Sequence, residues 1–210
     1  MADYVHLIAQ GALVVLVIVV GFTVKKLHKK SKENQAQLAI KEKERGKKRA
    51  AASKTVKIIH WGEQFVIDGG LIDRDHKTLF GLINEFNQNI PRYRSFDQMV
   101  LVLAALKKYT QTHFQREEKL QNVSGYPFQE DHKNEHAEII KKFDGWVQKA
   151  KSANEDTITD VAVEIGSFLR EWLTEHVIEQ DLPMKPYVDR MREHARGMGP
   201  LTKDSARPSP

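Results

Sequence analysis

The sequence predicts an all-α protein, an up-down-up-down four-helix bundle with an N-terminal transmembrane helix. Three observations predict it. Between residues 71 and 183, apolar residues recur at the 3.6-residue period of amphipathic helices in four segments of similar length. The connections between these segments are short, which makes consecutive helices antiparallel neighbours. Ahead of them, residues 7–24 are almost wholly apolar and contain no formally charged residue.

The apolar run is long enough to cross a bilayer, because roughly 20 residues span the hydrocarbon core as a helix. A cleaved signal peptide would have a basic start and a small-residue cleavage site, whereas this chain opens with Met1-Ala2-Asp3 and continues into lysines. Lysines that follow a membrane helix stay on the cytoplasmic side. We therefore expect a single-pass protein of the cell inner membrane, with its C-terminal domain in the cytoplasm.

Residues 25–57 are strongly basic, with thirteen Lys or Arg against three Glu, whereas residues 58–210 carry a net charge of −4. A basic segment beside a membrane helix is expected to contact anionic lipid headgroups. No aromatic residue interleaves the charges of residues 25–55, which argues against nucleic acid as a partner. The chain has no Cys, which excludes thiolate metal sites and disulfides. The expected parts are an anchor at 1–24, a basic helical linker at 25–55, the bundle at 56–192 and a mobile tail at 193–210.

The four helical segments follow one another between strong breaks. The first begins near Ile72 and is stopped by Pro91, and the second begins at Ser95. The third starts after Pro127, and the fourth runs from about Thr157 until Pro183 limits it. The apolar faces of these helices also carry five imidazoles: His76 on the first, His113 on the second, His132 and His136 on the third, and His176 on the fourth.

The spacing of these residues predicts a metal site inside the bundle. His113 and Glu117 are four residues apart, as are His132 and His136, so each pair lies on one face about one turn apart. A break at residues 124–127 folds the third helix back against the second, which brings the two pairs to one level. A single inward His is usually a hydrogen-bonded core residue. Five imidazoles and a Glu, however, would be costly to bury unpaired, and metal coordination removes that cost.

Asp181 requires a separate argument because it lies five residues after His176. Five steps rotate a straight α-helix by ~500°, which leaves the carboxylate about 140° off the face of His176. Asp181 can therefore join the site only if the fourth helix ends or distorts near Gln180. Pro183 favours such a distortion.

A family resemblance rests on five short motifs. They read Ile72-Asp73-x-x-His76-Lys77-x-Leu79-Phe80, His113-Phe114-x-x-Glu117-Glu118, Tyr126-Pro127, His132-x-x-x-His136 and Trp172-Leu173-x-x-His176-x-x-x-x-Asp181. On these motifs the chain resembles hemerythrin in its bacterial form, bacteriohemerythrin, over about residues 56–192. All seven ligand positions of the family pattern are filled.

The resemblance implies a non-haem di-iron centre, with two Fe ions bridged by an oxygen atom, that binds O₂ reversibly. One iron would be held by His132, His136 and His176. The other would be held by His76 and His113 and would keep an open position for O₂. Glu117 and Asp181 would bridge the two irons. No catalytic residue is implied.

The ligand set favours an oxygen carrier over an enzyme. Carboxylate-rich di-iron enzymes use Glu-x-x-His pairs, and no His here has Glu three residues before it. Five imidazoles with two carboxylates also give little negative charge to stabilise high-valent iron. We expect a non-enzymatic protein for local oxygen delivery, storage or sensing. No segment has the size of a signalling domain, which favours delivery, with a membrane oxygen-consuming enzyme as a candidate partner.

Two alternatives use the same scaffold. One is a di-iron oxidase, peroxidase or nitric-oxide-handling enzyme. The other is iron storage or a structural metal, which is disfavoured because two irons per chain make a poor store. Phe80, Phe114 and Trp172 lie close to the expected ligands in the sequence and are candidates for sealing the site from water. For Phe114 we favour a simple role in the core.

Overall fold

The computed structural model describes residues 2–55 and 57–197, with side chains from Val20 onward. In this part of the chain every regular element is helical, so the predicted all-α class is confirmed. The chain divides into two compact units, Met1–Lys47 and Lys48–Pro210. The first unit is a single stretch of helix α1 (Ala2–Thr55). The second unit contains the end of α1 and all the other helices, and the candidate site lies within it.

The expectation of a transmembrane helix and an inner-membrane location is contradicted. Among the described residues, no helix combines the length and the apolar character that crossing a bilayer requires. Residues 25–55 of α1 carry charged side chains within every two turns, and charges are costly in the hydrocarbon core. The side chains of residues 2–19, which hold most of the apolar run at 7–24, lie outside the described residues.

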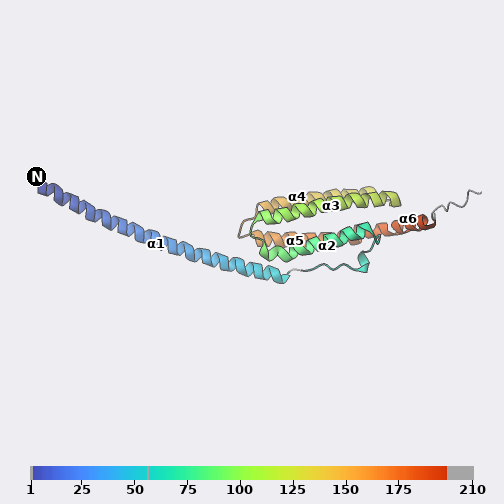
Figure 1. Ribbon diagram of the computed structural model, residues 1–210, viewed down its shortest axis with the longest axis horizontal. Helices are drawn as coiled ribbons and strands as arrows, with labels where there is room; N and C mark the ends of the chain where they lie inside the picture. The colour runs from blue at the N-terminus through green and yellow to red at the C-terminus, as the bar shows by residue number, and fades with distance from the viewer. Residues whose placement is uncertain (1, 56, 198–210) are drawn as a thin grey trace, which may run out of the picture. The chain divides into compact units, whose positions relative to one another are not determined.

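Four helices form the bundle: α2 (Leu71–Asn89), α3 (Phe96–Ser124), α4 (Gln129–Lys151) and α5 (Ile158–His176). They lie side by side in Figure 1, where α2 contacts α3 and α5, and α4 contacts α3 and α5. A short 3₁₀ turn, η2 (Ile90–Arg92), and two loops connect them. This is the arrangement that the short connections predict, and its interior receives one apolar face from each helix.

Two carboxylates fix the beginning of α2. Asp68 accepts hydrogen bonds from the backbone N–H groups of Gly70 at 2.8 Å and Ile72 at 3.2 Å. Asp73 accepts one from the backbone N–H of Ile67 at 2.9 Å. The bond to Ile72 satisfies an N–H group that the first turn of a helix cannot pair by itself, and the bonds to Gly70 and Ile67 fix the chain that leads into the helix. They therefore hold in place the helix that carries His76.

The end of α3 is set by Gly125, which has a φ of 67° in the left-handed region. Glycine adopts this conformation without the steric cost of a Cβ atom. The following residue, Tyr126, donates its backbone N–H to the carbonyl of Gln121 at 3.0 Å, which closes the helix end. The chain can then turn into α4, as the break in the sequence predicts.

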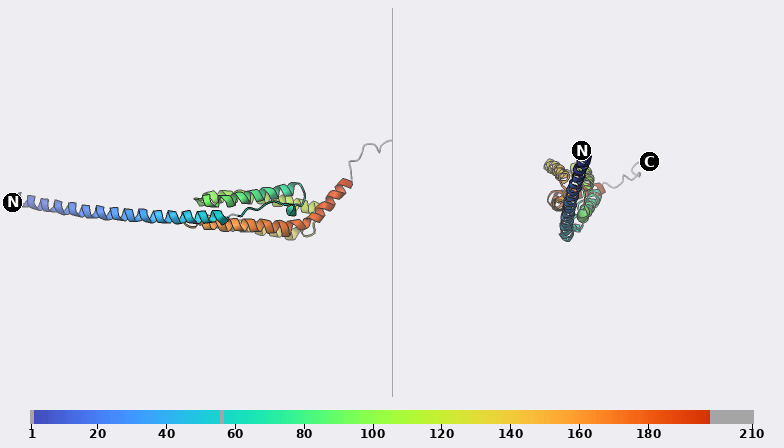
Figure 2. Two further views of the ribbon diagram at one scale, coloured as in Figure 1. Left: turned by 90° about the horizontal axis from the view of Figure 1, so that it is seen from below. Right: turned by 90° about the vertical axis from the view of Figure 1, so that its left-hand side faces the viewer.

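The fourth helix is distorted between His176 and Asp181, which is where a distortion is needed to bring Asp181 onto the same face as His176. The regular part of α5 ends at His176, and residues Val177–Asp181 form a π-helix, η3. A 3₁₀ turn, η4 (Leu182–Met184), contains Pro183 and leads into α6 (Lys185–Gly197). In Figure 2, α6 leaves the axis of α5 at an angle. The part of the expected tail up to Gly197 is therefore helical, and residues 198–210 lie outside the described residues.

The apolar core has two parts along the bundle axis. The larger cluster contains Leu79 and most of the buried apolar residues of α2–α5. The smaller one consists of Ile67, Ile72, Tyr126, Met184 and Val188. On α2, Ile72 belongs to the smaller cluster and Leu79 to the larger one, and His76 lies between them. The polar site is thus enclosed by apolar packing on both sides.

Gly166 of α5 lies close against the side chain of Asn87 of α2. A Cβ atom built there would lie 2.2 Å from Oδ1 of Asn87 and 3.0 Å from Cδ1 of Ile90. Asn87 is buried, and its Nδ2 donates a hydrogen bond of 2.9 Å to the carbonyl of Ile83. The amide therefore cannot move away without losing a buried bond.

Gly166→Ala is expected to lower the free energy of unfolding by about 1–3 kcal/mol, because it overpacks this contact. Gly145→Ala is the matched control, since a Cβ there meets nothing within 4 Å. The control should raise the free energy of unfolding by roughly 0.5–1 kcal/mol through helix propensity. Urea denaturation of the two variants measures both effects. Equal shifts in the same direction would contradict the close approach.

Candidate metal centre

The structure brings together all seven residues that the sequence singles out as ligands. All seven residues are buried, and the most exposed of them, His176, has only 4% of its surface accessible. They come from every helix of the bundle. The set consists of His76 of α2, His113 and Glu117 of α3, His132 and His136 of α4, His176 of α5 and Asp181 of η3.

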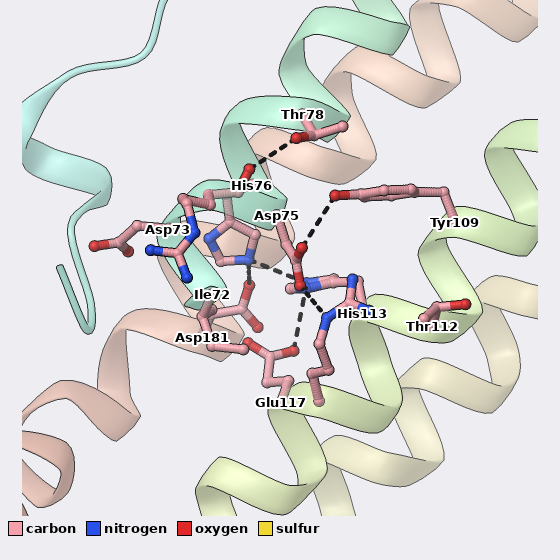
Figure 3. Close-up of polar contacts among 12 residues, drawn as sticks. Ile72, Asp73, Asp75, His76, Thr78, Tyr109, Thr112, His113, Glu117 and Asp181 are labelled. Carbon is pink, nitrogen blue, oxygen red and sulfur yellow. Dashed lines mark hydrogen bonds and ion pairs between the residues drawn. The ribbon is translucent and has the colours of Figure 1, made fainter. Parts of the chain in front are cut away.

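The donor atoms form two overlapping groups, in each of which all atoms lie within 4.8 Å of one another. One group contains three imidazoles, those of His132, His136 and His176, and the other contains the two imidazoles of His76 and His113. Glu117 and Asp181 belong to both groups. The four residues of the second group point toward one another in Figure 3.

Asp181 lies between the two groups. Its Oδ1 is 3.1 Å from Nε2 of His132 and 3.2 Å from Nε2 of His176. Its Oδ2 is 3.2 Å from Nε2 of His76, on the other side. One carboxylate thus presents one oxygen to each group of imidazoles, which is the geometry of a bridging ligand.

The π-helix explains how Asp181 reaches this position. In a π-helix the backbone bond runs from residue i to i+5, so that five residues make about one turn. His176 and Asp181 are five residues apart, and their side chains therefore meet on one face. A straight α-helix would have turned the carboxylate away.

Glu117 approaches the same groups from α3. Its Oε2 is 3.2 Å from Nε2 of His136, 3.6 Å from that of His132 and 3.7 Å from that of His113. The four-residue spacing of His113 and Glu117 places both on the inner face of α3, as the sequence predicts. Glu117 therefore also contacts both groups.

Most of these donor atoms have no hydrogen-bond partner, although they are buried. This holds for both carboxylate oxygens of Glu117 and of Asp181 and for Nε2 of three imidazoles. Nε2 of His76 faces Nε2 of His113 at 3.1 Å. Buried polar groups without partners are costly, and their convergence on common points fits cations as the missing partners. Imidazole nitrogen with carboxylate oxygen is a donor set that suits iron.

The charges of the cluster are strongly coupled. Burial opposes ionisation of Glu117, but the neighbouring imidazoles outweigh burial and lower its pKa to about 2. Burial acts in the same way on Asp181, and His176, His132 and His76 hold its pKa well below the ordinary value. Burial disfavours the charged form of His132, yet the two carboxylates raise its pKa to about 10. Two buried anions therefore demand positive charge from their surroundings.

Two acidic residues behind the imidazoles were missed by the sequence reasoning. Glu118 Oε1 lies 3.1 Å from Nδ1 of His136, and Asp75 Oδ2 lies 3.5 Å from Nδ1 of His113. Burial alone would raise the pKa of Asp75, but the contact with His113 and the hydrogen bonds from Arg116 and Tyr109 hold that pKa well below the usual range. Both acids stand directly beside a predicted ligand in the sequence. That adjacency is the signal that could have found them.

Aromatic rings enclose the cluster. Phe114 stacks on the imidazole of His136, with ring centroids 3.6 Å apart and planes at 4°. It is a buried core residue, as expected, but it also fixes the plane of a candidate ligand. Trp172 lies 6.1 Å from the ring of His176, and both residues line a pocket of about 290 Å³ between α4 and α5. Trp61 and Phe80 pack together on the side of His76.

Known proteins with similar sequences carry the same kind of domain. Residues 70–188 match the family model described as the hemerythrin HHE cation binding domain. Bacteriohemerythrin of Clostridium acetobutylicum is 29% identical over 132 residues, which cover 61% of this chain and 98% of that protein. Hemerythrin of Phascolopsis gouldii is 28% identical over 125 residues, which cover 60% of this chain and 89% of that protein.

The fold is also found among solved structures. A crystal structure of a hemerythrin variant aligns with a TM-score of 0.52 at 24% sequence identity, over 62% of this chain and 97% of that one. The likeness concerns the arrangement of helices, and the sequence match concerns more than half of the chain. The chain therefore belongs to the hemerythrin family, with an HHE cation-binding domain at residues 70–188.

Proposed function

We propose that this chain binds two iron ions in the seven-residue cluster and uses them to bind O₂ reversibly. As a member of the hemerythrin family it is a non-haem iron, oxygen-binding protein and not an enzyme. The observation that carries the proposal is the overlap of two donor groups that share two carboxylates. Two separate metal sites would have no reason to share both of their anionic ligands.

In this proposal His132, His136 and His176 hold one iron, and His76 and His113 hold the other. Glu117 and Asp181 bridge them, which is supported by the contacts of both carboxylates with both groups. The second iron has one imidazole fewer. A metal with fewer protein ligands keeps a position open for an exogenous molecule, and O₂ would bind there.

Two iron ions bound here would supply electrons for the reversible attachment of O₂. The protein side chains determine whether this attachment reverses. Five neutral imidazoles and two carboxylates provide little negative charge, which favours release of O₂ over its cleavage. Phe114 and Trp172 exclude water from the imidazoles that they contact. Exclusion of water protects a reactive site from side reactions.

We further propose local delivery or storage of O₂ as the role of this chemistry, with an oxygen-consuming enzyme as the recipient. The support is the ligand set, which favours release of intact O₂.

The His132→Ala, His136→Ala double variant is expected to bind at most one iron per chain, where the wild-type chain binds two. Loss of ligands should also destabilise the fold, because each buried polar group left without a partner costs about 1–3 kcal/mol. Iron analysis of the purified protein and thermal unfolding measure the two effects. His194→Ala is the control, since His194 is exposed on α6 and lies outside the cluster. Full iron occupancy in the double variant would refute the ligand assignment.

The reduced, iron-loaded chain should develop colour in air, bleach when O₂ is removed and repeat this over several cycles without added reductant. Absorption spectra recorded under alternating argon and air make the measurement. If a single exposure to O₂ left the protein permanently oxidised and consumed an added substrate in proportion, the carrier function would be excluded.

Trp172→Ala should shorten the life of the coloured form several-fold, because it removes the ring beside His176 and widens the pocket that both residues line, which gives water more access to His176. Trp146→Ala is the matched control. Trp146 packs at the edge of the core against Phe168 and makes no ring contact with any of the candidate ligands in the described part of the chain. Equal lifetimes in the two variants would show that the tryptophan beside His176 has no special role in excluding water.

A further inference from the structure

Asp75 occupies an unusual place beside the cluster. It precedes His76 on α2, so its side chain points about 100° away from that ligand, toward α3. The side chain is almost fully buried, with 6% of its surface accessible. Figure 3 shows its carboxylate facing Tyr109 and His113. Nothing in the di-iron ligand assignment uses this residue.

Three residues of α3 contact the carboxylate. Arg116 donates from Nε to Oδ2 at 2.5 Å, and Tyr109 donates its hydroxyl to Oδ1 at 3.0 Å. Oδ2 also lies 3.5 Å from Nδ1 of His113, an electrostatic contact at the outer limit of hydrogen-bond range. Positions 109, 113 and 116 share one face of α3 because they are four and three residues apart. Asp75 is thus held at both oxygens and faces the back of one imidazole.

The contact with Nδ1 has a defined chemical effect. An anion at Nδ1 stabilises the tautomer with its proton on that nitrogen, and Nε2 is then free to coordinate a metal. Nε2 of His113 is the atom that faces Nε2 of His76 and Glu117. Nδ1 makes no hydrogen bond in either His113 or His76, so the contact of His113 with Asp75 is electrostatic. Among the described residues of the second group, only His113 has a carboxylate behind its ring.

We infer that Asp75 is a positioning residue for His113, which fixes the tautomer and orientation of this imidazole and strengthens it as a ligand of the iron that keeps the open position. The inference rests on the proposed function, because it places iron at the cluster. Arg116 and Tyr109 act on His113 through Asp75. Glu118 has the corresponding place behind His136 in the other group, at 3.1 Å from Nδ1.

Asp75→Asn in the full iron-loaded chain tests this inference, because it removes the charge and keeps the shape. The affinity for ferrous iron should fall about 10- to 100-fold, the usual effect of losing a carboxylate behind a metal-bound His, and a chelator should therefore remove the iron faster. The reduction midpoint potential of the centre should rise, because a lost negative charge disfavours the oxidised state. A purely structural role for Asp75 would leave the potential unchanged at full iron content.

Asp144→Asn is the matched control, since Asp144 of α4 is an exposed carboxylate that pairs with Lys107 of α3 and belongs to neither donor group. It should change neither iron release nor the potential. If Asp75→Asn does not fold, Tyr109→Phe removes one bond to the carboxylate and should shift both readouts in the same direction by a smaller amount. In a folded Tyr109→Phe variant, unchanged readouts would count against the inference.

The possible results distinguish a failure of the proposed function from a failure of the inference about Asp75. A wild-type chain that binds no iron overturns the proposed function and this inference together. A wild-type chain with two irons, and an Asp75→Asn variant with unchanged release rate and potential, overturns the inference alone. Faster release together with a raised potential supports it.

Discussion

The burial of two carboxylates among five imidazoles is the constraint on which the rest of the fold depends. Glu117 and Asp181 are fully buried, and none of their four oxygens has a hydrogen-bond partner. In an apolar interior such groups are tolerated only with compensating positive charge. The bundle surrounds them with imidazoles and with apolar clusters on both sides along its axis. The four helices therefore converge on a charged cluster, and the fold is stable only when the two negative charges of this cluster are balanced by positive charge.

The ends of the helices position the metal-binding residues more than the middles of the helices do. Asp68 and Asp73 fix the first turn of α2, one turn before His76. Gly125 ends α3 two turns after Glu117 and turns the chain toward the two imidazoles of α4. The middles of the helices pack as an ordinary apolar core, with the tight contact at Gly166. Local backbone features thus set the register of the ligands, and apolar packing preserves it.

Much of the bundle and the cluster could be predicted from the sequence because both follow helical periodicity. Four-residue spacing places Glu117 with His113 and His136 with His132 whatever the tertiary contacts are. Asp181 could be predicted only conditionally, because a π-helix does not follow from spacing. Asp75 and Glu118 each stand beside a ligand in the sequence, which marks them as candidates, but the imidazoles that they contact belong to other helices, and that pairing depends on packing. The membrane helix was inferred from the length of an uncharged apolar run and the lysines that follow it, and the described part of α1 contradicts it.

The π-helix at Val177–Asp181 also has a mechanical consequence. The imidazoles project from regular α-helices, whose backbone bonds resist changes of pitch. Asp181 is instead carried by a wide turn between α5 and the 3₁₀ turn at Pro183, where three kinds of helical bonding succeed one another within eight residues. The carboxylate of Asp181 is therefore the one ligand that is not held by continuous i→i+4 backbone bonding, and its distance from both groups of imidazoles depends on the length of this wide turn.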